Sequence, residues 1–154
     1  MAHESCVAMW DVIKKIVLCG RTVIFTSQSA TECKALSSRL AILVKGKLIY
    51  DGSPKDIMVR HAHGLTVTIH AKTDDKGQPV PLVDVVLYVK EGFPQTKLIA
   101  EGEESVHLYV PINNKPIYRL FATLQMAHHK IGFEKFLIRY TTMEDVYTMF
   151  QHVT

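Results

Sequence analysis

The sequence lacks any long hydrophobic run and any leader. Its apolar blocks, such as Ala41–Val44 and Val85–Val89, are far shorter than the roughly 20 residues of a membrane-spanning helix. The first six residues, MAHESC, have neither the basic nor the apolar region of a secretory signal peptide. We therefore expect any connection to a membrane to come from sequence outside these 154 residues.

Cysteine and clustered charge are also scarce. The three cysteines, Cys6, Cys19 and Cys33, are odd in number and form no C-x-x-C pair, which predicts reduced thiols in a reducing compartment. The 18 Lys and Arg outnumber the 15 Asp and Glu, for a net charge of +3, but they are scattered along the chain. A weakly basic chain with no basic-aromatic motif predicts no nucleic-acid partner.

The first part of the sequence predicts a helix, a strand and a second helix. Apolar residues recur at helical spacing over 5–18 and stop before Gly20. Thr22–Ser27 is short and nearly all apolar, as is typical of a strand buried on both faces. Ser29 and Glu32 have the spacing of a capping box, which opens a helix whose apolar face runs as far as Leu40.

Two strands, 40–45 and 47–50, are then expected to form a hairpin at Gly46. A turn is expected at Asp51–Gly52, and Ser53 with Pro54 predicts a short helix through Arg60. A buried strand needs parallel neighbours, which this part of the sequence does not supply. It therefore indicates part of an α/β layer rather than a complete domain.

The rest of the sequence predicts a second, α+β unit. Leu65 opens a strand in which apolar residues alternate with Thr66 and Thr68, a pattern typical of a half-buried strand. Thr141 and Glu144 have the spacing of another capping box before the final helix. The order strand–helix–strand–strand–helix–strand, with this helix added, is the ferredoxin-like pattern. We expect its elements at 65–71, 82–90, 97–101, 106–111, 116–130 and 133–139, with a loop at 72–81.

Three segments resemble the ABC transporters of subfamily A, which move lipids. Residues 26–36 (TSQSATECKAL) resemble T-S-H-S-M-E-E-C-E-A-L of that family, and residues 39–46 (RLAILVKG) with the GSP at 52–54 resemble R-L-A-I-M-V-x-G and G-S-P. Residues 140–150 (YTTMEDVYTMF) resemble the family's T-T-L-E-x-V-F-x-x-F ending. The resemblance implies an α/β protein: residues 1–63 are a partial P-loop ATPase α/β layer, the end of the second nucleotide-binding domain, and residues 64–154 are a ferredoxin-like α+β regulatory domain.

By this resemblance Gln28 stands where the family has its switch histidine, a catalytic and ATP-binding position, while Ala2 and His3 stand where the D-loop has Asp and Pro. A Gln amide donates a hydrogen bond to phosphate but cannot carry a proton. The sequence has no G-x-x-x-x-G-K-[ST] loop, signature motif or catalytic Glu, so we expect no ATP hydrolysis by this chain alone. ATP and Mg would then be cofactors of a full-length parent. Gln28 as a surface loop residue with no remaining role is an equally open interpretation.

The implied partners are the remainder of the nucleotide-binding domain, the twin nucleotide-binding and regulatory domains, and the transmembrane domains of the parent. The implied location is the cytoplasmic side of a membrane. A second hypothesis is a non-catalytic regulatory or interaction module that pairs nucleotide-binding domains. The histidine pairs His61 and His63, and His128 and His129, lack ligand partners at suitable spacing, so we expect no metal site.

Overall fold

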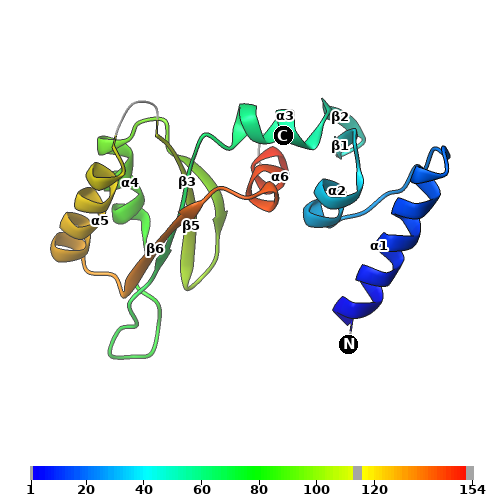
Figure 1. Ribbon diagram of the computed structural model, residues 1–154. Coiled ribbons are helices and arrows are strands. Elements are labelled where there is room, and N and C mark those ends of the chain that lie inside the picture. Colours follow the sequence, from blue (N-terminus) through cyan, green and yellow to red (C-terminus); the bar gives the residue numbers. More distant parts are fainter. Residues whose placement is uncertain (1, 113–115, 152–154) are drawn as a thin grey trace. The chain divides into compact units, whose positions relative to one another are not determined.

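The computed structural model describes residues 2–112 and 116–151, with only the backbone of residues 2–6 (Figure 1). The chain forms two compact units, Met1–Asp56 and Ile57–Thr154, whose boundary falls within α3. The predicted family domains, 1–63 and 64–154, remain a prediction. The elements are α1 (Ala2–Leu18), α2 (Ala30–Leu36), β1 (Leu40–Val44), β2 (Lys47–Gly52), α3 (Pro54–His61), β3 (Gly64–His70), α4 (Val83–Gly92), β4 (Lys97–Glu101), β5 (Ser105–Pro111), α5 (Ile117–Ile131), β6 (Lys135–Tyr140) and α6 (Met143–Gln151).

In the first unit, β1 and β2 form the predicted antiparallel hairpin. Its turn has positive φ angles at Lys45 (49°) and Gly46 (77°), the backbone conformation that two-residue hairpin turns require. Leu40, Ile42 and Val44 are buried and alternate with exposed residues, so only one face of β1 is packed. The helix predicted from Ser53 and Pro54 is α3, and the Ser53 hydroxyl accepts the Asp56 N–H at 3.0 Å.

Three predictions for this unit are wrong. Thr22–Ser27 forms no strand, and the Ile24 side chain is 92% exposed. A strand needs a partner for its backbone hydrogen bonds, and in the described part of this unit β1 and β2 pair only with each other. The α2 helix ends at Leu36, so Leu40 lies in β1 rather than on a helix face. In addition, Asp51–Gly52 belongs to β2 instead of forming a turn.

The second unit has the predicted ferredoxin-like architecture. Its four-stranded antiparallel sheet has the order β4-β5-β3-β6, which places β3 and β5 in the centre. The helices α4 and α5 share one core with the sheet (Figure 1). Burying each large aliphatic side chain there contributes about 1.5–3 kcal/mol. The core comprises Leu65, Val67, Ile69, Val85, Val89, Phe93, Val106, Leu108, Val110, Leu120, Leu124, Ala127 and Phe133.

The central strand β3 is buried on both faces, whereas the alternating sequence predicted a half-buried strand. The side of β3 that carries Thr66 and Thr68 is covered as well, with Thr66 0% and Thr68 7% exposed. The Thr66 hydroxyl donates to Asp145 Oδ2 at 3.1 Å, and Thr68 Oγ1 lies 3.0 Å from His107 Nδ1. The prediction was wrong because these threonines have polar partners on that side, buried Asp145 and half-buried His107, which remove the cost of burying a hydroxyl.

The last helix is capped one residue later than predicted. The Thr142 hydroxyl, not that of Thr141, accepts the Asp145 N–H at 3.4 Å, and Asp145 Oδ2 accepts the Thr142 N–H at 2.8 Å. Thr141 instead is buried, and its hydroxyl donates to the Gly64 carbonyl at 3.1 Å. The prediction of a Thr141–Glu144 box was therefore wrong: Thr141 is drawn into the buried contact with Gly64, and Asp145, which also forms an ion pair with Arg139 at 2.5 and 2.8 Å, pairs with Thr142.

We predict that Asp145→Ala lowers the free energy of unfolding of the second unit by about 2–4 kcal/mol. The substitution leaves Arg139, Thr66 and the Thr142 N–H without their shared acceptor. Urea denaturation followed by far-UV circular dichroism measures the change. Asp75→Ala, in the exposed 72–81 loop, is the matched control and should shift the free energy by less than about 0.5 kcal/mol. Equal midpoints for the two variants would contradict the prediction.

The pKa of Asp145 predicts how stability depends on pH. Burial raises this pKa, but the hydrogen bonds from Arg139 and Thr142 outweigh burial and hold it below its ordinary value. A depressed folded-state pKa contributes stability above the unfolded-state pKa, about 3.9, and this stability is lost as the pH falls through the folded value. Urea midpoints should therefore fall below about pH 4, and fall less steeply in Asp145→Asn. If the urea midpoint depends on pH equally steeply in both proteins, Asp145 is not the group responsible.

Candidate functional site

Gln28, the position predicted from the family resemblance, lies in the irregular segment just before α2. Its side chain is exposed, and no hydrogen bond from its amide to another described residue is present. The amide is thus free to meet a ligand or a second protein surface, and it has no visible role in holding this unit together.

The backbone on both sides of Gln28 is held by a short chain of hydrogen bonds. The Ser29 hydroxyl accepts the Glu32 N–H at 3.3 Å, which confirms Ser29 as the N-cap of α2. The Ser29 N–H donates to Ser27 Oγ at 3.0 Å, and the Ser27 hydroxyl donates to Glu32 Oε2 at 2.6 Å. In an ordinary capping box the Glu carboxylate accepts the N-cap N–H directly. Here Ser27 stands between them, a contact that the capping-box spacing did not predict.

The chemistry available at this loop is limited. An amide at Gln28 donates and accepts hydrogen bonds but takes no proton near neutral pH. The nearby Cys33 thiol is not activated, because burial first and the Glu32 carboxylate second raise its pKa. A thiol with a raised pKa stays neutral and is a poor nucleophile. This loop can therefore position a phosphate or a water, but Gln28 and Cys33 do not supply a general base or a nucleophile.

The two predicted D-loop positions cannot be placed in this site. The backbone of Ala2 and His3 lies in α1, and their side chains are outside the described residues. Farther along α1, apolar side chains are exposed, among them Met9 (53%), Val12 (54%) and Leu18 (86%). The helix contacts α2. Val7 (42%) and Val17 (49%), two of the residues whose helical spacing predicted this helix, are exposed as well, which the sequence did not predict.

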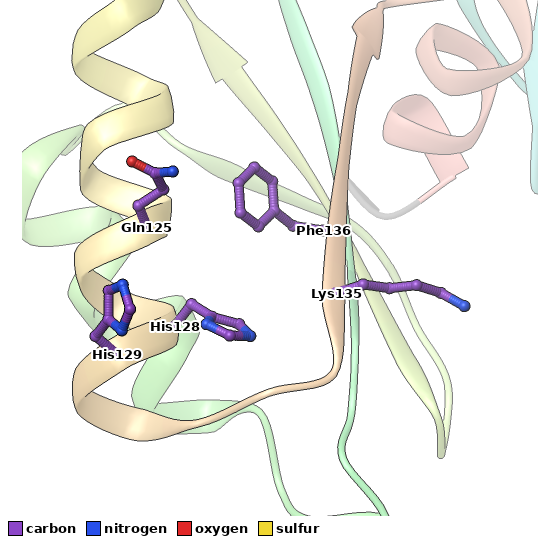
Figure 2. A pocket seen from close by; sticks show the side chains of 5 residues that line it. All are labelled: Gln125, His128, His129, Lys135 and Phe136. Atoms are coloured by element: carbon purple, nitrogen blue, oxygen red, sulfur yellow. The ribbon is translucent and has the colours of Figure 1, made fainter.

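A small cavity of about 280 Å³ lies between α5 and β6 and contains one of the histidine pairs. Figure 2 shows His128 and His129 on α5, Phe136 across from them on β6, and the Lys135 side chain directed away from α5. The two imidazole centroids are 5.9 Å apart and the rings nearly perpendicular, and the His128 ring meets Phe133 edge-on at 5.0 Å. His128 is therefore an aromatic packing residue.

The other histidine pair is split between two surroundings. The His61 ring packs edge-on against Phe150, with 5.0 Å between centroids. The His63 carbonyl accepts the Ile112 N–H at 3.4 Å. Within the described part of the chain, no three His, Cys, Asp or Glu side chains come together as a metal site would require. No helix described in the structure is both long and apolar enough to cross a bilayer.

Comparison with known proteins gives related sequences over nearly the whole chain. The chain is 30% identical over 145 residues to the human phospholipid-transporting ATPase ABCA3. This match covers 94% of the chain and 8% of ABCA3. The chain is 29% identical to the mouse ATP-binding cassette sub-family A member 17 and 31% identical to the human glucosylceramide transporter ABCA12, each over 92% of this chain. The chain spans only 8% and 5% of those two proteins. No family model matches the sequence.

The matches are to the same family as the resemblance carried by residues 26–36, by 39–46 with 52–54, and by 140–150. Because each match extends over 142–145 of the 154 residues, it includes parts of both structural units. The chain belongs to subfamily A of the ABC transporters, and it corresponds to a short part of them.

Proposed function

We propose that this chain is the C-terminal part of an ATP-driven lipid transporter and contributes the switch loop and the regulatory domain to it. Residues 1–63 are the end of the second nucleotide-binding domain in this proposal, and residues 64–154 are the regulatory domain. Two relatives, a phospholipid-transporting ATPase and a glucosylceramide transporter, support a lipid as the transported substrate. The chain acts on the cytoplasmic side of the membrane, with ATP and Mg bound by the parent.

The observation that carries the proposal is the loop at Gln28. The hydrogen bonds among Ser27, Ser29 and Glu32 fix the backbone of this loop, while the Gln28 amide is exposed. The residue at the switch-histidine position has to hold one hydrogen-bond donor at the phosphate. A donor that its loop already holds in place stabilises the developing negative charge, because the loop does not have to rearrange during the reaction. With Gln in place of His, the donor remains but proton exchange is lost. The parent site therefore binds ATP and turns it over slowly.

The uncovered apolar surface of the first unit supports the remainder of the nucleotide-binding domain as a partner. Besides the exposed residues of α1, the Ile24 side chain is 92% exposed, in the segment whose sequence predicts a buried strand. The indole Nε1 of Trp10 is buried and makes no hydrogen bond with any described residue. Apolar surface of this extent usually meets another protein surface. Parallel strands of the same ATPase domain would pair with 22–27 and give it the strand conformation that it lacks here.

A second candidate function is a non-catalytic module that pairs nucleotide-binding domains. The second unit leaves β4 and β6 as sheet edges, and β6 carries Leu137 (57% exposed) and Tyr140 (80% exposed). An open strand edge offers backbone hydrogen bonds to another chain, such as the twin regulatory domain. The two candidates differ in the sequence that precedes residue 1 in the gene. A phosphate-binding loop and membrane spans encoded there favour the transporter, whereas a start site favours the module.

We predict that the 154-residue chain shows no saturable ATP binding below about millimolar concentration. The reason is that its sequence lacks the loop whose amides and lysine hold the phosphates. Trp10, the single tryptophan, lies in the first unit and serves as the fluorescent reporter. A parallel titration of N-acetyltryptophanamide corrects for absorption by the nucleotide. Saturation at micromolar ATP would overturn the proposal that the site is completed elsewhere.

We also predict that, in the parent transporter with its other ATP site inactivated, Gln28→His raises the steady-state rate of ATP hydrolysis by roughly tenfold or more. An imidazole can exchange a proton as charge builds on the phosphate, which an amide cannot do. Gln28→Asn keeps the amide chemistry and is the control, with no expected increase. A normal hydrolysis rate at the unsubstituted site would refute the role given to Gln28.

A further inference from the structure

A pocket in the second unit has a rim of positive charge. Its volume is about 390 Å³, and residues from α3, α4, β4, β5 and α6 line it. Arg60 and His61 end α3, Lys90 lies near the end of α4, and Lys97 begins β4. No Asp or Glu is among the described lining residues, so four basic side chains converge without a carboxylate in the pocket.

Arg60, Lys90 and Lys97 form no ion pair with a described acidic residue. Among the described residues, the ion pairs are Arg39–Asp51, Lys135–Glu134 and Arg139–Asp145, and none includes Arg60, Lys90 or Lys97. The positive charge of two of these side chains acts on the imidazole of His61, which also lines the pocket. The pKa of His61 lies below its ordinary value, first because the ring is partly buried and then because Lys97 and Arg60 repel a proton there.

Apolar side chains of α6 and the phenol of Tyr109 also line the pocket. Tyr109 is only 8% exposed, and Val146, Met149 and Phe150 of α6 lie beside it. Burial raises the pKa of Tyr109, so its hydroxyl keeps its proton and remains a donor. Gly64 makes room for the ring, since a Cβ there would lie 2.6 Å from Tyr109 Cε2. Gly64 thus allows the Tyr109 ring to lie against β3.

We propose that this pocket binds a phosphate monoester attached to an apolar group. The basic rim matches a doubly charged phosphate, the Tyr109 hydroxyl supplies a hydrogen bond, and the α6 wall accepts the apolar part. The same chemistry occurs in a small soluble phosphate ester and in a lipid with a phosphate headgroup. This site lies in the second unit and does not depend on the ATP role proposed for Gln28.

The first test is an NMR titration of the ¹⁵N-labelled full chain with phenyl phosphate. We expect saturable shifts of the Thr96, Lys97 and His61 amides, and a weaker response to inorganic phosphate because it lacks the apolar group. Lys97→Glu should weaken binding by roughly tenfold, since it reverses one charge at the rim. Lys76→Glu makes the same charge change in the exposed 72–81 loop and should leave the affinity unchanged.

Two further measurements separate a pocket from general attraction to positive charge. Tyr109→Phe keeps the ring and the fold, so it should weaken binding several-fold by loss of the donor alone. The pKa of His61, followed by its ring proton resonances, should rise when the ligand is bound, because a dianion offsets Lys97 and Arg60 from β4 and α3 and Lys90 from α4. Equal weakening by Lys76→Glu and Lys97→Glu, or an unmoved His61 pKa at saturation, would overturn the proposal.

Flotation with vesicles distinguishes the two sources of the phosphate. If the ligand is a lipid headgroup, the chain should float with vesicles that contain phosphatidic acid and not with pure phosphatidylcholine, and Lys97→Glu should abolish the flotation. Binding of phenyl phosphate without flotation supports a soluble phosphate ester. Absence of both responses refutes the site.

Discussion

The carboxylate of Asp145 is the contact on which the second unit depends. It accepts hydrogen bonds from Thr66 on the central strand, from Arg139 on β6 and from the first turn of its own helix. One buried acceptor thus joins the sheet to α6, on the side of β3 that α4 and α5 do not cover. Such a charge is tolerable only because every oxygen has a donor, and removing one partner leaves the others unpaired in a medium of low dielectric.

The position of α6 also determines which side chains line the basic pocket. With Asp145 fixed, Val146, Met149 and Phe150 form one wall of the basic pocket, and Phe150 packs against His61 from α3. Segments far apart in the sequence, 60–61, 96–98 and 146–150, therefore share one surface. The charge at this surface comes from α3, α4 and β4, and its apolar part comes from the helix that Asp145 holds.

The first unit has a different character. Its buried apolar residues are few, Ala30, Leu40, Ile42 and Val44, and much of α1 is uncovered. The loop at Gln28 is nevertheless defined, because its order comes from local hydrogen bonds among Ser27, Ser29 and Glu32 rather than from a core. The partner that we propose for this unit, the remainder of the nucleotide-binding domain, would cover these exposed side chains and so account for the contrast.

The sequence by itself determined the features that arise within a few residues: the hairpin at Gly46, the Ser29 cap, the order of elements in the second unit, and the family. The role of Gln28 was predicted in the same way, because a motif lies within a short stretch of sequence, and it stays a prediction. Only the tertiary structure decided that Thr22–Ser27 has no strand partner, that β3 is buried on both faces, and that Asp145 rather than Glu144 closes the α6 cap. The physical reason is the same in each case: pairing and burial depend on groups distant in sequence, which spacing and periodicity do not encode.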